Sequence, residues 1–174
     1  MPIPDFVDGY HLPRGIHEAT LKEVEDRFGN STNTRIRVWK CFLALMDRLN
    51  QLGLTPDEIY IDGSFVTGRN EPGDVDFAVL IRPGKTKRAL KTASDHDKRA
   101  IQLFSNPAAQ DDIRDLFGAH FLIADVPMAL DKYTSLFRVG LPGVGLRDPE
   151  PNKDPSWVKK PKEKGIIRLV EETN

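Results

Sequence analysis

The sequence has one cysteine, Cys41, among 174 residues. A single thiol excludes an internal disulfide framework and a cysteine-based zinc site. Cys41 lies within an apolar helical pattern, which favours a small buried side chain over a catalytic thiol. The scattered histidines His11, His17 and His96 show no ligand spacing. They therefore indicate no histidine metal site.

Long apolar runs are also missing. No run approaches the ~18 residues that a membrane span needs. The N-terminal residues MPIPDFVDGYHLPRG lack the basic start and the apolar stretch of a signal peptide. Charge of one sign is missing too, because 25 Lys and Arg stand against 26 Asp and Glu. Bulk charge therefore favours no class of partner, and the sequence predicts a cytoplasmic protein without a membrane partner.

The length suits one domain over residues 1–174. Residues 1–15 carry three prolines and two glycines, which predicts an extended N-terminal arm. Residues 141–165 are rich in proline, glycine and charge, which predicts an irregular loop before a last strand at 166–170. A segment of this length without regular structure is typical of a lid, a binding loop or a disordered stretch.

Apolar periodicity predicts an α/β (α+β) fold, with helices packed on one face of a small mixed sheet. Strand patterns occur at 58–62, 75–81, 120–126 and 166–170. Helical patterns occur at 17–29, 33–53, 85–104, 108–118 and 128–140. Gly53 and Gly118 fit left-handed helix ends.

Residues 61–81, IDGSFVTGRNEPGDVDFAVLI, place Asp74 and Asp76 in an apolar strand pattern. Burying an unpaired charge costs on the order of several kcal/mol, so two carboxylates in an apolar strand are unexpected unless something compensates their charge. Residues two apart in a strand share a face, while Val75, Phe77 and Val79 face a core. A hard divalent cation between the carboxylates would relieve their repulsion. Asp74 and Asp76 are thus predicted metal ligands and catalytic residues, with Mg²⁺ as the cation and Mn²⁺ as an alternative.

The turn before this strand predicts a phosphate site. Gly63 and Ser64 follow the first strand pattern, and a Gly-Ser turn lets backbone N–H groups and a hydroxyl approach phosphate oxygens. Gly68, Arg69 and Asn70 extend the loop. Gly63, Ser64 and Arg69 are therefore predicted to bind and neutralise the phosphates of a nucleoside triphosphate such as ATP.

The pattern Gly63-Ser64, nine residues, Asp74-Val75-Asp76 resembles the nucleotidyltransferase superfamily with the DNA polymerase β-like fold. The order of elements over residues 33–126 extends the resemblance. The chain also looks like a group of small bacterial nucleotidyltransferase-like proteins that share LPxGIHEAT, here residues 12–20, and KGII, here residues 164–167. The resemblance implies transfer of a nucleoside monophosphate to a tRNA, protein or small-molecule acceptor.

The resemblance also implies a third carboxylate from the next strand, and this sequence departs from that pattern. If Phe121 and Ile123 face the core, His120 shares the face of Asp74 and Asp76. His120 would then ligate metal or act as a general base. A bulge that shifts the register would bring Asp125 to this place instead. Asp62, before Gly63, stands where the family has an apolar residue and reads as a strand-end polar group.

The chain is too short for the helical domain that many nucleotidyltransferases carry, and minimal members of the superfamily pair with a helical protein in toxin–antitoxin systems. The resemblance thus implies a cognate helical partner. The absent third carboxylate leaves an alternative, a non-catalytic module that binds a nucleotide or a partner, as an antitoxin does.

Two further segments carry charge or an aromatic side chain. The basic segment from Lys85 to Arg99 would attract tRNA or another nucleic acid, or simply face solvent. Trp157 stands before lysines, where it would stack a base or pin the long loop, and pinning is favoured.

Overall fold

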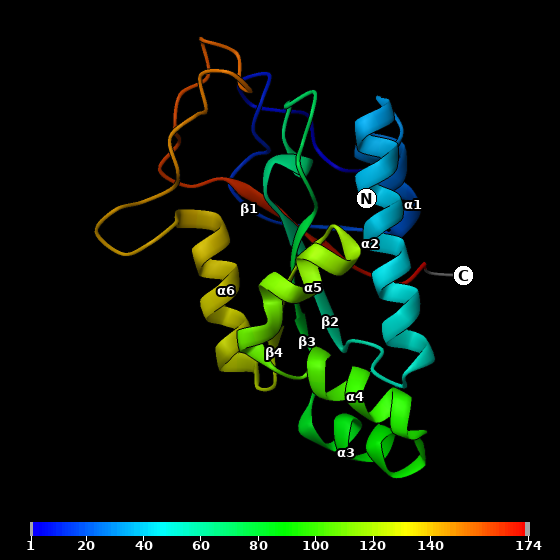
Figure 1. Ribbon diagram of the computed structural model, residues 1–174. Helices are drawn as coiled ribbons and strands as arrows, with labels where there is room; N and C mark the ends of the chain where they lie inside the picture. The colour runs from blue at the N-terminus through cyan, green and yellow to red at the C-terminus, as the bar shows by residue number, and fades with distance from the viewer. Residues whose placement is uncertain (1, 173–174) are drawn as a thin grey trace.

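The computed structural model describes residues 2–172, which form a five-stranded mixed sheet with helices on both faces (Figure 1). The strands are β1 (Gly15–Ala19), β2 (Glu58–Asp62), β3 (Asp76–Leu80), β4 (His120–Ala124) and β5 (Gly165–Leu169). The α-helices are α1 (Leu21–Val24), α2 (Asn33–Gln51), α3 (Pro83–Thr92), α4 (Asp95–Phe104), α5 (Gln110–Phe117) and α6 (Pro127–Val139). Shorter turns are the π-helical η1 (Glu25–Gly29) and the 3-10 turns η2 (Ser64–Val66) and η3 (Pro107–Ala109).

The strand order β1-β5-β2-β3-β4 places the last strand in the chain between the first and the second. β1 runs parallel to β5 and β3 parallel to β4, whereas β2 is antiparallel to both β3 and β5. The sequence did not predict β1, because the helical pattern of residues 17–29 overlaps it. In the structure a strand fills 15–19, and Thr20 caps α1 with a capping box.

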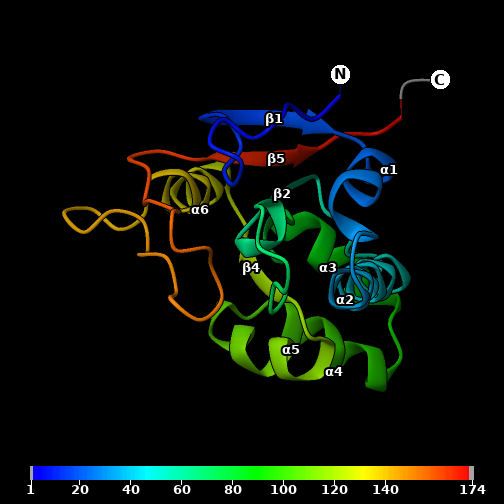
Figure 2. The same cartoon turned by 90° about the horizontal axis from the view of Figure 1, so that it is seen from above.

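The larger core lies between the sheet and the helices α2, α4 and α5. Phe77 and Val79 of β3 face it together with Phe121 and Ile123 of β4, as predicted. The predicted α+β fold is also confirmed, except that the helices do not all lie on one face of the sheet. Helix α6 packs on the opposite face, where Leu130 and Phe137 contact a second cluster. Figure 2 shows α6 and α2 on opposite sides of the sheet.

The second cluster explains why the prediction of helices on one face was wrong. Ala78 and Leu80 of β3 are fully buried on the α6 face. A strand that is apolar on both faces needs cover on both. Glu58 and Arg168 pair on this face near the end of β3, and further polar side chains stand at the upper end, where β3 and β4 begin. That end is where Asp76 and His120 lie.

The predicted helix 85–104 is two helices, because the chain leaves helical geometry at Ala93 and Ser94 caps α4. Gly53 and Gly118 have positive φ after α2 and α5, as predicted. Between α6 and β5 the chain has no helix or extended strand, only a bridge between Leu141 and Gly145. None of the helices in residues 2–172 combines the length and apolar character needed to cross a membrane.

Candidate functional site

The end of β2 and the start of β3 bring the Gly-Ser turn against Asp76. The antiparallel register pairs Asp62 with Asp76, so Gly63 follows directly beside that carboxylate. A Cβ atom at Gly63 would lie 1.9 Å from Oδ2 of Asp76. Gly63 also has φ +78°, a conformation that side chains disfavour. Only glycine therefore allows the backbone and the carboxylate to approach in this way.

Asp74 lies two residues before Asp76, just outside β3, and its side chain contacts α5. Its carboxylate is 11% exposed and lies 2.5 Å from Nη2 of Arg114, a side chain that is 48% exposed. Burial raises the pKa of Asp74, and the charge of Asp76 raises it further, while Arg114 and His120 oppose the change. The two aspartates thus interact through their charges, as the sequence predicted.

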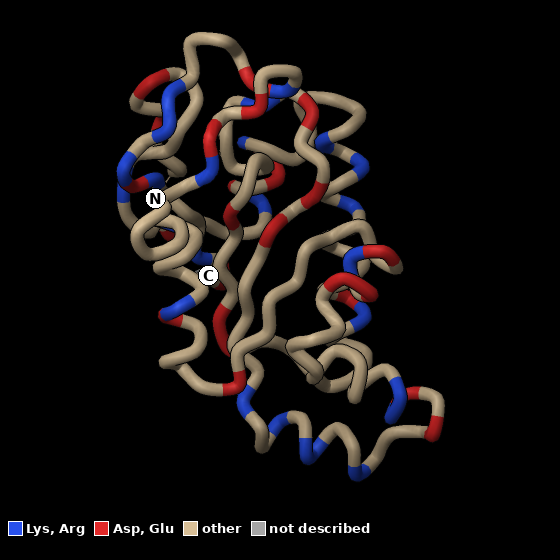
Figure 3. The backbone as a smooth tube through the Cα atoms, turned by 60° about the vertical axis from the view of Figure 1, so that its left-hand side comes forward, with Lys and Arg blue, Asp and Glu red and all other residues tan. Residues whose placement is uncertain are grey.

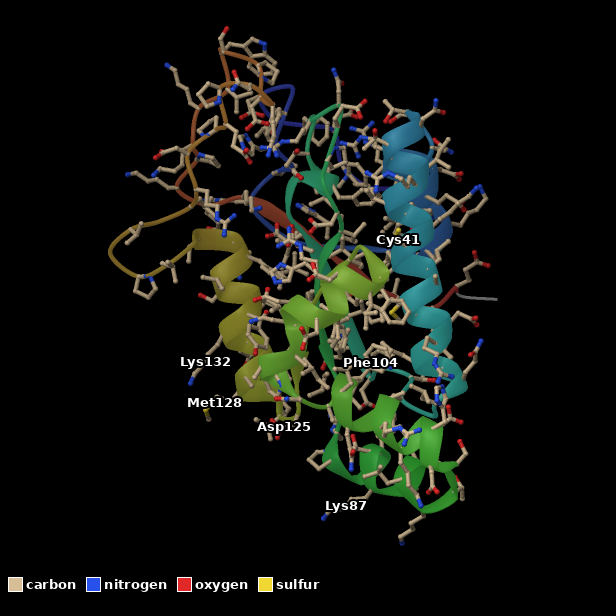
Figure 4. The ribbon with its side chains drawn as sticks, viewed as in Figure 1. Cys41, Lys87, Phe104, Asp125, Met128 and Lys132 are labelled. Atoms are coloured by element: carbon tan, nitrogen blue, oxygen red, sulfur yellow. The ribbon has the colours of Figure 1, made fainter. Side chains whose placement is uncertain are left out.

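His120 is the β4 residue that faces this pair. The parallel register places His120 beside Asp76, and Nδ1 lies 2.6 Å from Oδ1 of Asp76. Nε2 lies 3.3 Å from Oε1 of Gln110 on α5. The predicted alternation of β4 is therefore confirmed, and His120, not Asp125, occupies the place beside the aspartates. Asp125 lies past the other end of β4, near the start of α6 (Figure 4).

The sequence missed the role of Asp62. Its side chain lies on the same face as Asp76 and is buried, with Nζ of Lys164 at 2.7 Å. Burial raises the pKa of Asp62; Lys164 opposes this change and the charge of Asp76 adds to it. A row of polar side chains thus crosses the sheet in the order Lys164, Asp62, Asp76 and His120. The position of Asp62 at the end of an apolar strand is the one sequence feature that points to a role for it.

Arg69 does not stand free for a phosphate, so this predicted role does not fit the geometry. Its Nε and Nη2 lie 2.8 Å and 2.7 Å from the two carboxylate oxygens of Asp154, and Nη1 lies 3.2 Å from Glu150. Tyr10 also donates a hydrogen bond to Asp154. Burial alone would raise the pKa of Asp154, but the hydrogen bonds from Arg69 and Tyr10 outweigh it and lower the pKa to about 2.

These contacts fasten the long segment to the arm and to the turn after Ser64. Trp157 adds an edge-to-face contact with Tyr10, with ring centroids 6.4 Å apart. The prediction that Trp157 pins the long segment is confirmed. We call Tyr10, Arg69, Glu150 and Asp154 the latch.

The donor set of the site suits a divalent cation only in part. Within residues 2–172, no three His, Cys, Asp or Glu side chains converge as a metal site. Asp74 and Asp76 supply two hard oxygen ligands; the side chain of Asp74 is 11% exposed and that of Asp76 is 25% exposed. Magnesium commonly binds one or two carboxylates together with substrate phosphates. The residues therefore fit a cation that arrives with a phosphorylated ligand.

Fold and site together define an α+β protein with interacting carboxylates and a histidine at one end of a sheet face. The chain belongs to a family of unknown function, DUF6932, which matches residues 4–169. A search of curated proteins and a search of solved structures each found no match.

Proposed function

We propose that this protein is a metal-dependent nucleotidyltransferase. The observation that carries the proposal is the contact between the Gly63 backbone and the Asp76 carboxylate. It places a turn suited to phosphate oxygens beside a pair of carboxylates suited to a hard cation. The resemblance of residues 63–76 to the nucleotidyltransferase pattern supports the same reading. A reaction that uses nucleoside triphosphates would take place in the cytoplasm.

Asp74 and Asp76 would hold Mg²⁺ or Mn²⁺. When bound, the cation would neutralise charge on the phosphates of the substrate. Ser64 would donate its hydroxyl to a phosphate oxygen, and the missing side chain at Gly63 would leave room for that oxygen. Arg114 would leave Asp74 at low cost, because its own side chain is 48% exposed and can turn into solvent, while the bound cation would compensate the charge of Asp74.

His120 would take the proton of the acceptor. With Nδ1–H donated to Asp76, the lone pair at Nε2 is available once the Gln110 amide turns away. The acceptor hydroxyl oxygen would form a bond to the α-phosphorus, and the bond from that phosphorus to the bridging oxygen would break. Pyrophosphate would leave, and the hydroxyl proton would rest on Nε2. The acceptor would be a tRNA end, a protein or a small molecule.

The test is a transfer assay with α-labelled nucleoside triphosphates, Mg²⁺ or Mn²⁺, and a total cell extract as the source of acceptors. Asp76→Asn should lower the transfer of label by about 10²-fold or more, because it removes a cation ligand. The control is Asp125→Asn, at the other end of β4, which should transfer label like the unchanged protein. Full transfer by Asp76→Asn would refute the assignment.

A second candidate is a non-catalytic module that binds a nucleotide or a helical partner, as in a toxin–antitoxin pair. The contacts of the site favour it, because Asp74, Asp76 and Asp62 each already lie against a partner side chain, which is Arg114, His120 and Lys164 respectively. Calorimetry with ATP, GTP, CTP and UTP, with and without Mg²⁺, separates the two. Metal-dependent binding without transfer of label supports the module, and transfer of label excludes it.

A further inference from the structure

Helix α3 has charge of one sign. Residues 83–92 include four basic side chains and no acidic one. The basic side chains are Lys85, Lys87, Arg88 and Lys91. Figure 3 shows this run of Lys and Arg along the lowest helix, with no Asp or Glu between them. The segment therefore differs from the chain as a whole, whose net charge is −1.

Three of these side chains point away from the protein. Lys87, Arg88 and Lys91 fall within a sector of about 100° around the helix axis. Ala89, on the opposite side, is buried, and Leu90 packs against the main core. Figure 4 shows Lys87 at the lower edge of the molecule. The apolar side of α3 thus fixes the helix so that its basic side faces solvent.

Internal ion pairs do not account for these three cations. In the part of the chain that the structure describes, no carboxylate lies within the 4.0 Å limit of an ion pair with Lys87, Arg88 or Lys91. In contrast, Lys85 and Arg82 both pair with Asp57. Without a carboxylate partner, the positive field of these exposed side chains remains available to a partner.

The residues around Lys87, Arg88 and Lys91 indicate which kind of partner this surface suits. A membrane-binding helix carries Trp, Phe or Leu beside its cations, whereas the other exposed residues of α3 are Pro83, Gly84 and Thr92. A surface for single strands uses aromatic side chains to stack bases, and α3 has none. The basic side of α3 is therefore suited to phosphate contacts that need neither apolar insertion nor stacking, as in contacts to a duplex backbone.

We propose that the solvent-facing side of α3 binds the phosphate backbone of double-helical nucleic acid. A cavity of about 480 Å³ adjoins this surface at the start of the helix, and its lining combines Arg82, Lys85 and Arg88 with the carboxylates of Asp57 and Asp125. Contacts of this kind are independent of sequence and weaken steeply with salt.

This surface is separate from the candidate site. Asp76 and Leu80 stand at opposite ends of β3, about 13 Å apart along the strand, and α3 begins beyond Leu80. The inference therefore does not rest on the proposed transfer reaction, and substitutions on α3 leave Asp74, Asp76 and His120 in place.

Fluorescence anisotropy with labelled RNA and DNA hairpins of about 20 base pairs tests the proposal. The variant Lys87→Glu/Lys91→Glu should bind at least about 10-fold more weakly. Between about 50 mM and 200 mM NaCl, its slope of log affinity against log salt should be smaller by about 2, because two phosphate contacts are lost. The hairpin that binds more tightly identifies the natural duplex.

The matched control is Arg37→Glu/Lys40→Glu, which makes the same charge change at two exposed positions of α2. Its affinity for the hairpins should stay within about twofold of that of the unchanged protein, because salt screens charges on α2 from a duplex bound to α3. An equal loss in both double variants would reduce the effect to net charge and overturn the proposal. So would the absence of binding to either hairpin, or tighter binding to vesicles of anionic lipid. Lys87→Gln/Lys91→Gln should show the same loss without charge reversal, and circular dichroism checks that each variant folds.

Discussion

Asp74 and Asp154 both have buried carboxylates that pair with an arginine, yet their pKa values shift in opposite directions from the ordinary value. Burial raises the pKa of Asp74, and Asp76 adds to the effect. Burial acts in the same sense on Asp154, but the hydrogen bonds of the latch lower its pKa to about 2. The difference lies in the partners: Arg69 is 11% exposed and binds both oxygens of Asp154, whereas Arg114 is 48% exposed.

The ionised Asp154 stabilises the fold, whereas the ionised Asp74 lies in an environment that is unfavourable for its charge. The latch satisfies Asp154 with charge-assisted hydrogen bonds, and the result is an ordered connection between segments far apart in the chain. At the candidate site the like charges of Asp74 and Asp76 remain close. Residual repulsion of this kind is typical of functional sites, because a ligand with positive charge can relieve it.

The largest expected effect is that of Gly63→Ala, which tests whether the site depends on the close approach of Asp76. A Cβ at this position would lie 1.9 Å from Oδ2 of Asp76, at φ +78°. Steric overlap and backbone strain should together lower the free energy of unfolding by about 3–5 kcal/mol in urea titrations. Gly73→Ala is the control, because nothing lies within 4 Å of its added Cβ. Equal stability of the two variants would contradict the geometry.

Replacing each arginine with alanine tests the comparison directly. Arg69→Ala leaves Asp154, which is 3% exposed, without its cation, and should lower the free energy of unfolding by about 2–3 kcal/mol. Arg114→Ala should lower it by about 1 kcal/mol, less than Arg69→Ala, because the Arg114 side chain is 48% exposed. Chemical denaturation of both variants measures the difference. If the two costs were the same, the distinction between latch and site would fail.

The latch should contribute to the pH dependence of stability. The pKa of Asp154 is about 2 in the folded state against an ordinary value of 3.8. Its contribution of about 2 kcal/mol is present above pH 3.8 and is lost as the pH falls toward 2. Thermal melts from about pH 5 to about pH 2 measure the loss. Asp154→Asn should lack this part of the decline; an unchanged decline in that variant would argue against the latch.

The smallest expected effect is a gain. Because the pKa of Asp74 is raised, its folded-state charge opposes folding above the folded pKa. Asp74→Asn should therefore raise the free energy of unfolding by up to about 1 kcal/mol near neutral pH. The gain should vanish below the ordinary value of 3.8, where both states are protonated. A loss of stability at neutral pH would mean that the pair with Arg114 outweighs the repulsion.

Local pattern was enough to predict the centre of the site. The alternation of Phe77 and Val79 with Asp76 fixes which side of β3 is buried, and the same period in β4 selects His120 over Asp125. Gly63 and Ser64 were predicted from the turn alone. Each of these features depends on residues within a few positions of one another, where strand periodicity constrains side-chain direction.

Long-range contacts were beyond such patterns. Arg69 meets Asp154 85 positions later, and Lys164 pairs with Asp62 only because β5 inserts beside β2. The segment GIHEA reads as the start of a helix until its parallel pairing with β5 is known. The sequence predicted one buried face and one acidic face for β3, whereas Ala78 and Leu80 are buried on the second face, which α6 covers.

The position of β5 in the sheet has a consequence for synthesis on the ribosome. β5 is made after the other four strands but lies between β1 and β2. Until residues 165–169 leave the exit tunnel, β1 has no neighbour in the sheet, β2 has an open edge, and Asp62 lacks its ammonium partner. The nascent chain therefore passes through a stage with an unpaired edge and a buried lone charge, in which a chaperone would find its target.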